Sequence, residues 1–182
     1  FPHIDFEEYS AAAEKIGQSS ILVLPLATKG EYFPFSNPKA VGFEKGNSSN
    51  PFDVFLGYLE GIAFIERLAM ETIQDFAAVV GPQVSMGGGA SNPFWLQIRA
   101  ETLGRPTVKP FETSSALGAA IIALAGDPAK ISATAKMVVQ YHPAFEPSER
   151  MIKQRDSRYQ EFLSELVKLD YWHPKIGRLA PL

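Results

Sequence analysis

The feature that most constrains the fold is a run of glycines between an expected strand and an expected helix. Residues 83–86 read as a short strand, the glycines occupy 87–89, and the helix spans 93–103. A second strand at 105–110 and a second helix at 116–125 follow. Because the order strand, helix, strand, helix is typical of parallel pairing with helices on the sheet faces, the sequence predicts an α/β fold.

The remaining segments read as helices around one further strand. Acidic residues open a helix at 5–16, where the helix dipole favours them, and a short buried strand is expected at 21–26. Residues 27–50 are dense in Gly, Pro, Asn and Ser and predict an ordered surface hairpin or excursion. Asn50 and Pro51 begin a long helix that is expected to reach about residue 80. Two helices complete the chain, at about 128–140 and 148–169.

The long helix carries polar residues at intervals of seven. Asp53, Glu60, Arg67 and Gln74 form this stripe, and the rest of the helix surface is largely apolar. The pattern predicts an interior helix between two layers, with only the narrow stripe facing water. Acidic residues in the stripe fit a catalytic role, but a solvated or ion-paired face is the favoured interpretation.

Composition limits the class of protein. The 182 residues favour a single domain, and the 46% of hydrophobic residues exclude a disordered chain. Lys and Arg number 17 against 20 Asp and Glu, which gives a net charge of −3 and predicts no nucleic-acid partner. The longest apolar run, Ala116–Ala125, is too short for a membrane span.

Cysteine is absent, which excludes disulfides, thiolate nucleophiles and Cys-ligated zinc. Its absence fits a reducing compartment, and we expect a cytoplasmic protein. The chain begins at Phe1 without an initiating Met or the basic start and apolar stretch of a signal peptide. We therefore expect it to be cut from a longer protein.

The glycine segment from Met86 to Pro93 is the one stretch that indicates chemistry. Glycines let a ligand approach the backbone N–H groups, and the following helix N-terminus adds partial positive charge, so phosphate is a natural ligand. Neither the P-loop nor the G-x-G-x-x-G pattern is present, and a tight strand-to-helix turn would use the same glycines. Asn92 fits either a helix cap or a contact to a base. The small residues 114–120 fit helix-on-sheet packing, with the far wall of a nucleotide cleft as an additional role.

The remaining candidate groups form no recognisable site. His3, His142 and His173 lack the spacing of metal ligands and are interpreted as surface or hydrogen-bonded histidines. No serine lies in the G-x-S-x-G pattern, and no Ser-His-acid set can be chosen. The sequence therefore predicts no catalytic and no metal-ligating residue within this chain.

The segments GGGASNPFWLQIRAETLGRP and ETSSALGAAIIALAG resemble the C-terminal lobe of the FGGY carbohydrate kinases. The resemblance covers roughly residues 20–170. Its motifs are Gly87–Ala90, Trp95, Gln97-Ile98, Leu103–Pro106, Ala116–Ala120, Leu24-Pro25-Leu26, Leu59–Phe64 and Tyr159–Leu163.

This resemblance implies an ATP-dependent sugar or polyol kinase with two lobes around a cleft. The chain is then the C-terminal nucleotide-binding lobe, an actin-like and ribonuclease-H-like ATPase lobe whose incomplete sheet has helices on both faces. Gly87, Gly88, Gly89 and Ala90 are expected on the α-phosphate and adenosine side of ATP, and Asn92 at the adenine, with Mg²⁺ bridging the phosphates. The family's catalytic Asp lies in the N-terminal lobe, so residues 1–182 alone are expected to be inactive.

Two other interpretations stay open. The first is a non-catalytic actin-like module that binds nucleotide for regulation or assembly. The second is a structural α/β domain in which the glycines only make a turn. The partners expected under the kinase interpretation are ATP, a small sugar or polyol and the missing N-terminal lobe of the same chain, and a homodimer is a further option. The resemblance also implies that the first β-hairpin of the lobe precedes residue 1, so the remaining strands would expose an edge.

Overall fold

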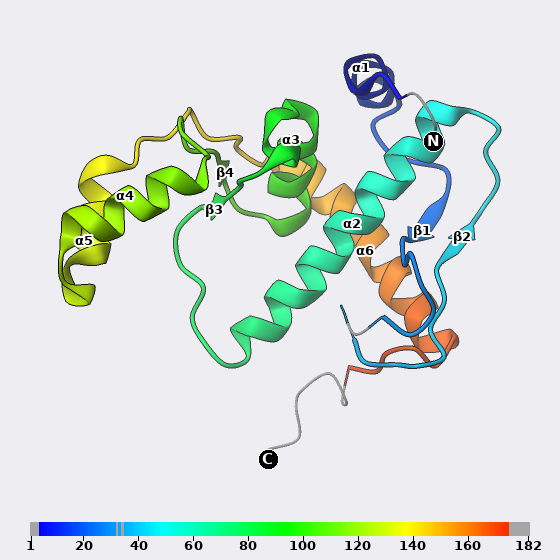
Figure 1. Ribbon diagram of the computed structural model, residues 1–182. Coiled ribbons are helices and arrows are strands. Elements are labelled where there is room, and N and C mark those ends of the chain that lie inside the picture. Colours follow the sequence, from blue (N-terminus) through cyan, green and yellow to red (C-terminus); the bar gives the residue numbers. More distant parts are fainter. Residues whose placement is uncertain (1–3, 32, 34, 175–182) are drawn as a thin grey trace.

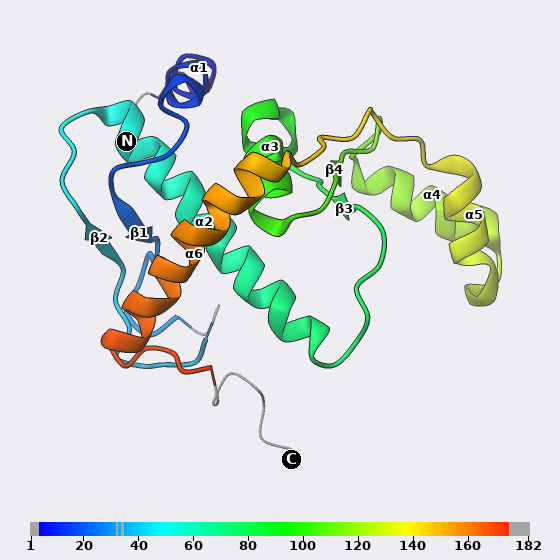
Figure 2. The ribbon, with the colours of Figure 1, turned by 180° about the vertical axis from the view of Figure 1, so that it is seen from behind.

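The chain is arranged around one long helix, α2 (Pro51–Gln74), which lies in the middle of the molecule (Figure 1). The computed structural model describes residues 4–31, 33 and 35–174. Helices α1 (Phe6–Ile16) and α3 (Pro93–Leu103) pack against α2, and α6 (Glu149–Lys168) crosses it on the face seen in Figure 2. The other helical segments are η1 (Gly88–Ser91), α4 (Ser115–Ala125), η2 (Pro128–Lys130) and α5 (Ile131–Val138).

Local capping explains where these helices begin and end. The Asp5 side chain accepts hydrogen bonds from the N–H groups of Glu7 and Glu8, at 2.9 and 3.2 Å, and so caps α1. Asn50 caps α2 in the same way. Helix α3 ends at Gly104, whose φ of +63° suits glycine. The expected helices are therefore found, with the bounds of 93–103 confirmed.

The strands form two small sheets. β3 (Gln83–Val84) pairs in parallel with β4 (Thr107–Val108), which confirms the expected parallel pairing. β1 (Leu22–Leu24) pairs with β2 (Phe43–Lys45), and that pair is antiparallel. No separate strand was assigned at β2, which lies in the segment 27–50 that is expected to form a surface hairpin or excursion.

Two apolar clusters hold the layers together. One lies between β1, α2 and α6, and the other between α1, α2 and α3, so α2 contributes to both and is the interior helix that its sequence predicts. The first cluster contains Leu22, Leu24, Phe64, Ile65, Leu68, Tyr159, Phe162 and Leu166. The second contains Ala13, Phe55, Leu56, Ala63 and Ile98.

The prediction that the polar stripe of α2 faces water is wrong for most of its length. Asp53 and Glu60 are buried and Arg67 is partly buried, whereas Gln74 is exposed. The middle of the stripe faces α6, whose Arg155 pairs with Glu60 and whose Asp156 pairs with Arg67 at 2.7 Å. Asp53 instead accepts hydrogen bonds from Ser20. The ion-paired alternative is therefore correct for Glu60 and Arg67.

Helix α2 ends earlier than expected, at Gln74 rather than near residue 80. Its last turn projects beyond the packed layers, and Ile73 and Phe76 are exposed there. Because tertiary burial, rather than propensity, stabilises most helices in proteins, the helix ends within two turns of Leu68, its last buried residue.

Helix α4 does not pack on a sheet as its small residues predicted. It packs mainly against α5 and η2, and its other face leaves Ile122 60% and Leu124 68% exposed. The strands available nearby, β3 and β4, span only two residues each, too few to cover an eleven-residue helix. Within the described residues, no single helix is long and apolar enough to cross a membrane, and one bent pair, α4 with 128–138, passes on length and composition alone.

Helix α2 and strand β1 come close together at Gly61. A Cβ placed on Gly61 would lie 2.4 Å from the carbonyl oxygen of Val23, a backbone atom that cannot turn aside. We expect Gly61→Ala to lower the free energy of unfolding by about 1–3 kcal/mol, although alanine is the better helix former. Urea unfolding would measure the change.

Gly118 in α4 offers the matched control for this prediction. A Cβ there would meet nothing within 4 Å, so Gly118→Ala is expected to raise the free energy of unfolding by about 0.5–1 kcal/mol. Equal effects at the two positions would contradict the claim that α2 and β1 are in backbone contact.

Candidate functional site

The glycine loop leaves β3 and leads into α3, as the sequence predicts. Gly87, Gly88 and Gly89 are exposed, and Ala90 is buried. The Ala90 N–H donates to the Gly87 carbonyl at 3.1 Å. Among the turn and loop hydrogen bonds of the described residues, none uses the N–H of Gly87, Gly88 or Gly89 as donor. The loop is therefore open, and three of its four amides are available to a ligand.

The three glycines differ in what the protein itself requires of them. Gly87 has a φ of +80°, a conformation that favours glycine, so the turn explains its identity. Gly88 has no positive φ, and a Cβ there would meet nothing within 4 Å. A Cβ on Gly89 would lie 3.4 Å from the indole nitrogen of Trp95. The turn therefore leaves Gly88 unexplained, whereas close approach of a ligand would account for it.

Asn92 caps α3. Its Oδ1 accepts a hydrogen bond from the Trp95 N–H at 3.2 Å, and its Nδ2 donates to the Ser10 hydroxyl at 2.8 Å. The capping interpretation is confirmed, and the amide also ties α3 to α1. One Nδ2 hydrogen is left for a base, because the amide has two donors.

A cavity of about 600 Å³ opens beside the glycine loop. The loop and the start of α3 supply Gly88, Gly89 and Asn92 to its lining. Helices α1 and α2 supply the apolar side chains Phe6, Phe55, Leu59 and Ile62, which the sequence analysis did not single out as site residues. For the three residues of α2, the sequence pattern that indicates a shared surface is the spacing 55, 59 and 62, which places three apolar side chains on one face of the helix.

A buried arginine lies under the loop. Arg99 of α3 donates to the hydroxyl of Ser85, which is buried at the end of β3, at 2.5 Å. Arg99 also pairs with Glu66 of α2 at 2.5 Å. Sequence reasoning missed this contact because its three members come from three different elements.

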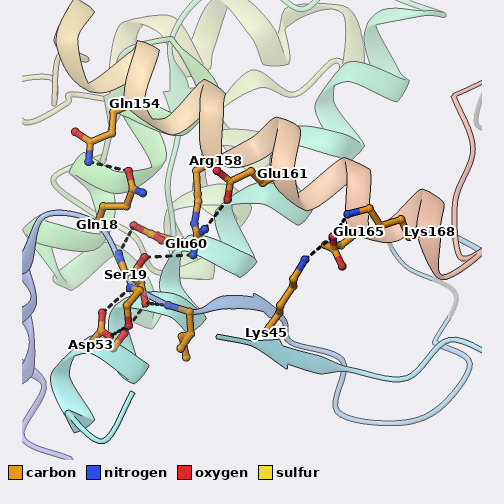
Figure 3. A network of polar contacts seen from close by, with 12 residues as sticks. Gln18, Ser19, Lys45, Asp53, Glu60, Gln154, Arg158, Glu161, Glu165 and Lys168 are labelled. Atoms are coloured by element: carbon orange, nitrogen blue, oxygen red, sulfur yellow. Dashed lines mark hydrogen bonds and ion pairs between the residues drawn. The ribbon is translucent and has the colours of Figure 1, made fainter. Parts of the chain in front are cut away.

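A second polar network joins α2 and α6 to the segment before β1 (Figure 3). Asp53, Ser19 and Glu60 lie at one end of the network, and Lys45, Glu165 and Lys168 lie at the other. The Ser19 N–H donates to Glu60 at 3.3 Å, and Glu165 pairs with both lysines at 2.6 Å. Asp53, Glu60 and Glu165 thus each accept a hydrogen bond or pair with a cation.

The two acids of the α2 stripe are bonded within the fold. Glu60 pairs with Arg155 in the core, and neither acid lines the cavity beside the glycine loop. Asp53 accepts hydrogen bonds from the N–H and hydroxyl of Ser20. Burial raises the pKa of Asp53, but hydrogen bonds from Ser20 and Ser48 lower it more, so the pKa lies below its usual value of 3.8.

The two described histidines, His142 and His173, lie apart from the glycine loop. The His142 ring packs against Phe111, with centroids 4.1 Å apart, and His173 contacts Asp170 at 2.6 Å. His3 lies outside the described residues. Among the described residues, no group of three or more His, Asp or Glu side chains is placed to hold a metal ion.

Comparison with known proteins identifies what the chain is similar to. The model of the C-terminal domain of the FGGY family of carbohydrate kinases matches residues 5–126. The chain is 27% identical to xylulose kinase from Bacillus subtilis (strain 168), over 96% of this chain and 35% of that protein. It is 34% identical to ribulokinase from Mycolicibacterium smegmatis, over 71% of this chain and 23% of that protein.

Solved structures share the fold. The crystal structure of xylulose kinase from Rhodospirillum rubrum superposes with a TM-score of 0.69 at 23% identity, over 90% of this chain and 34% of that one. The chain thus spans about a third of the length of the first curated relative and of this structure. The expected fold class is confirmed, with the strands of this chain in two small sheets.

Proposed function

Because the chain belongs to the FGGY family of carbohydrate kinases, we propose that residues 1–182 are the C-terminal nucleotide-binding lobe of an ATP-dependent sugar or polyol kinase. The rest of the enzyme, including the N-terminal lobe, lies in the two thirds of the relatives' length that this chain does not span. The observation that carries the proposal is Gly88, an exposed glycine that neither the turn nor packing requires.

The residues of the glycine loop fit a nucleotide. The exposed N–H groups of Gly87, Gly88 and Gly89 would donate to phosphate oxygens, and the N-terminal end of α3 would add favourable charge. Residues Gly87–Ala90 would together lie on the α-phosphate and adenosine side of ATP, and Asn92 would contact the adenine with its remaining amide hydrogen. Bound ATP would supply the γ-phosphoryl group, with Mg²⁺ reducing the charge on its phosphates.

The proposal assigns the phosphoryl acceptor to the other lobe. We infer that a sugar or polyol hydroxyl receives the γ-phosphoryl group and that the catalytic Asp is contributed by the N-terminal lobe, so residues 1–182 alone do not phosphorylate sugar. The exposed face of α4 supports a larger parent protein, because a helix without charges that is apolar all round is normally covered on all sides. Further strands from the same polypeptide, added beside β3 and β4, would cover it.

The proposal also covers the location of the protein and its macromolecular partners. A chain without cysteine fits the cytoplasm, where carbohydrate kinases of this type would meet ATP. The net charge of −3 gives no basis for a nucleic-acid partner. A homodimer is also part of the proposal, and its interface would lie away from the α4 face that the added strands cover.

Gly88→Val tests the nucleotide site. Its branched side chain would occupy the open space above the loop, so we expect the Kd for ATP to rise by about tenfold or more while the free energy of unfolding changes by less than about 1 kcal/mol. Titration of ATP followed by Trp95 fluorescence would measure binding.

Gly118→Val is the matched control, because Gly118 also faces open space but lies on α4. It should keep the wild-type affinity for ATP. A wild-type chain that shows no response to millimolar ATP would refute the proposed function, and equal binding by Gly88→Val and wild type would refute the assignment of the loop.

A further inference from the structure

Arg99 stands out because it is a charged residue that is only 8% exposed and lies next to an open loop. The motifs that relate this chain to its family include Trp95 and Gln97-Ile98, but not Arg99 or its hydrogen-bond partners Glu66 and Ser85. A buried ion pair is weak evidence for stability, since the cost of desolvation offsets much of its attraction. Arg99 therefore calls for a role other than general stabilisation.

The position of Arg99 is set by Glu66. Nε of Arg99 donates to Glu66 Oε2 at 2.7 Å, and Nη2 donates to Glu66 Oε1 at 2.5 Å. Two parallel hydrogen bonds of this kind fix both the place and the plane of a guanidinium group. Arg99 is thus anchored to α2, the most extensively packed helix of the fold.

The third nitrogen of the guanidinium reaches the start of the loop. Nη1 of Arg99 donates to the Ser85 hydroxyl at 2.5 Å. Ser85 is buried, its N–H donates to the Val108 carbonyl at 2.8 Å, and it lies two residues before Gly87. Ser85 is therefore held by β4 through its backbone and by Arg99 through its side chain.

The same guanidinium also contacts the residue that supports the end of the loop. Its carbon lies 5.7 Å from the ring centroid of Trp95, within the range of a cation–π contact. The indole ring of Trp95 lies beside Gly89, and the backbone N–H of Trp95 donates to the Asn92 side chain. One side chain thus joins the residue that enters the glycine loop to the aromatic ring against which the loop rests.

We propose that Arg99 is a positioning residue that holds the glycine loop in its nucleotide-binding conformation, through Ser85 on one side and Trp95 on the other. This inference rests on the proposed function. The arrangement reduces the entropy that the loop loses when phosphate binds, because the amides are already in place. A lysine cannot reproduce it, since one ammonium group cannot bond Glu66 with two parallel donors, reach Ser85 and stack on Trp95.

Arg99→Lys is the test, with Ser85→Ala as a second variant that removes only one hydroxyl. We expect both to raise the Kd for ATP, Arg99→Lys by about tenfold, while the urea midpoint of unfolding stays close to that of the wild type. NMR relaxation of the ligand-free chain should show the order parameters of the Gly88 and Gly89 amides falling from about 0.85 towards 0.6.

Arg67→Lys is the matched control, because Arg67 also joins α2 to a neighbouring helix but contacts neither Ser85 nor Trp95. It should leave ATP affinity and the loop order parameters unchanged. If wild type binds ATP and Arg99→Lys binds equally well with an equally ordered loop, the positioning role is refuted. If the loop loses order in Arg99→Lys but the wild type binds no ATP, the positioning role stands and the proposed function is refuted.

Discussion

Arg155→Met is expected to lower the free energy of unfolding by about 3–5 kcal/mol at pH 8. Arg155 is only 2% exposed and pairs with two buried carboxylates, Glu60 of α2 and Glu101 of α3. Methionine would fill a similar space without a charge, which would leave both carboxylates in the core without their cation. Urea unfolding monitored by circular dichroism would measure the loss.

The control for this prediction is Arg150→Met, on an exposed position of the same helix, which should change stability by no more than about 0.5 kcal/mol. The double variant Glu60→Gln with Arg155→Met should recover part of the loss, because one of the uncompensated charges is removed. Equal stability of the Arg155 and Arg150 variants would show that the buried pair contributes nothing.

The free energy of unfolding of the wild-type chain is expected to fall between pH 5 and pH 8, by at most about 3 kcal/mol from Glu60 alone. Burial raises the pKa of Glu60 from 4.5 to about 7, and the charge of Arg155 offsets only part of this effect. Between these two values the folded chain keeps a proton that the unfolded chain releases, so stability is lost as the pH rises. Below pH 4.5 and above pH 7 this contribution is constant.

Glu60→Gln separates this effect from other titrations, because glutamine keeps the oxygen that accepts from Ser19 but does not ionise. Unfolding in urea at half-unit intervals of pH should give a smaller slope for this variant than for wild type. Identical slopes would show that Glu60 does not titrate in this range.

Helix positions were predictable because their signals are local. Asp5, Asn50 and Asn92 each precede a helix and accept hydrogen bonds from its first turn, so a reader of the sequence can place those starts without any tertiary information. The end of α2 was not predictable in this way. It depends on how far the neighbouring elements cover the helix, and the residues near Gln74 carry no information about that.

The same distinction holds for the candidate site. The glycine loop is one continuous segment, and its strand-to-helix context could be read directly. The contacts of Arg99 join α3, α2 and β3, and the partners of Glu60 come from α6 and from the segment before β1. A seven-residue repeat places Glu60 on one face of its helix but does not say which element covers that face. The stripe was therefore expected to face water, whereas in the structure Glu60 is buried and ion-paired.

The packing of α6 also bears on how the chain folds during synthesis. Leu22 and Leu24 of β1 are buried against Tyr159, Phe162 and Leu166, more than 130 residues later in the chain. Since translation is vectorial, α2 can cover part of β1 early, but the side of this cluster that contacts α6 stays exposed to water until α6 has been synthesised. Nascent chains that stop before α6 should accordingly be bound by chaperones more than chains that include it.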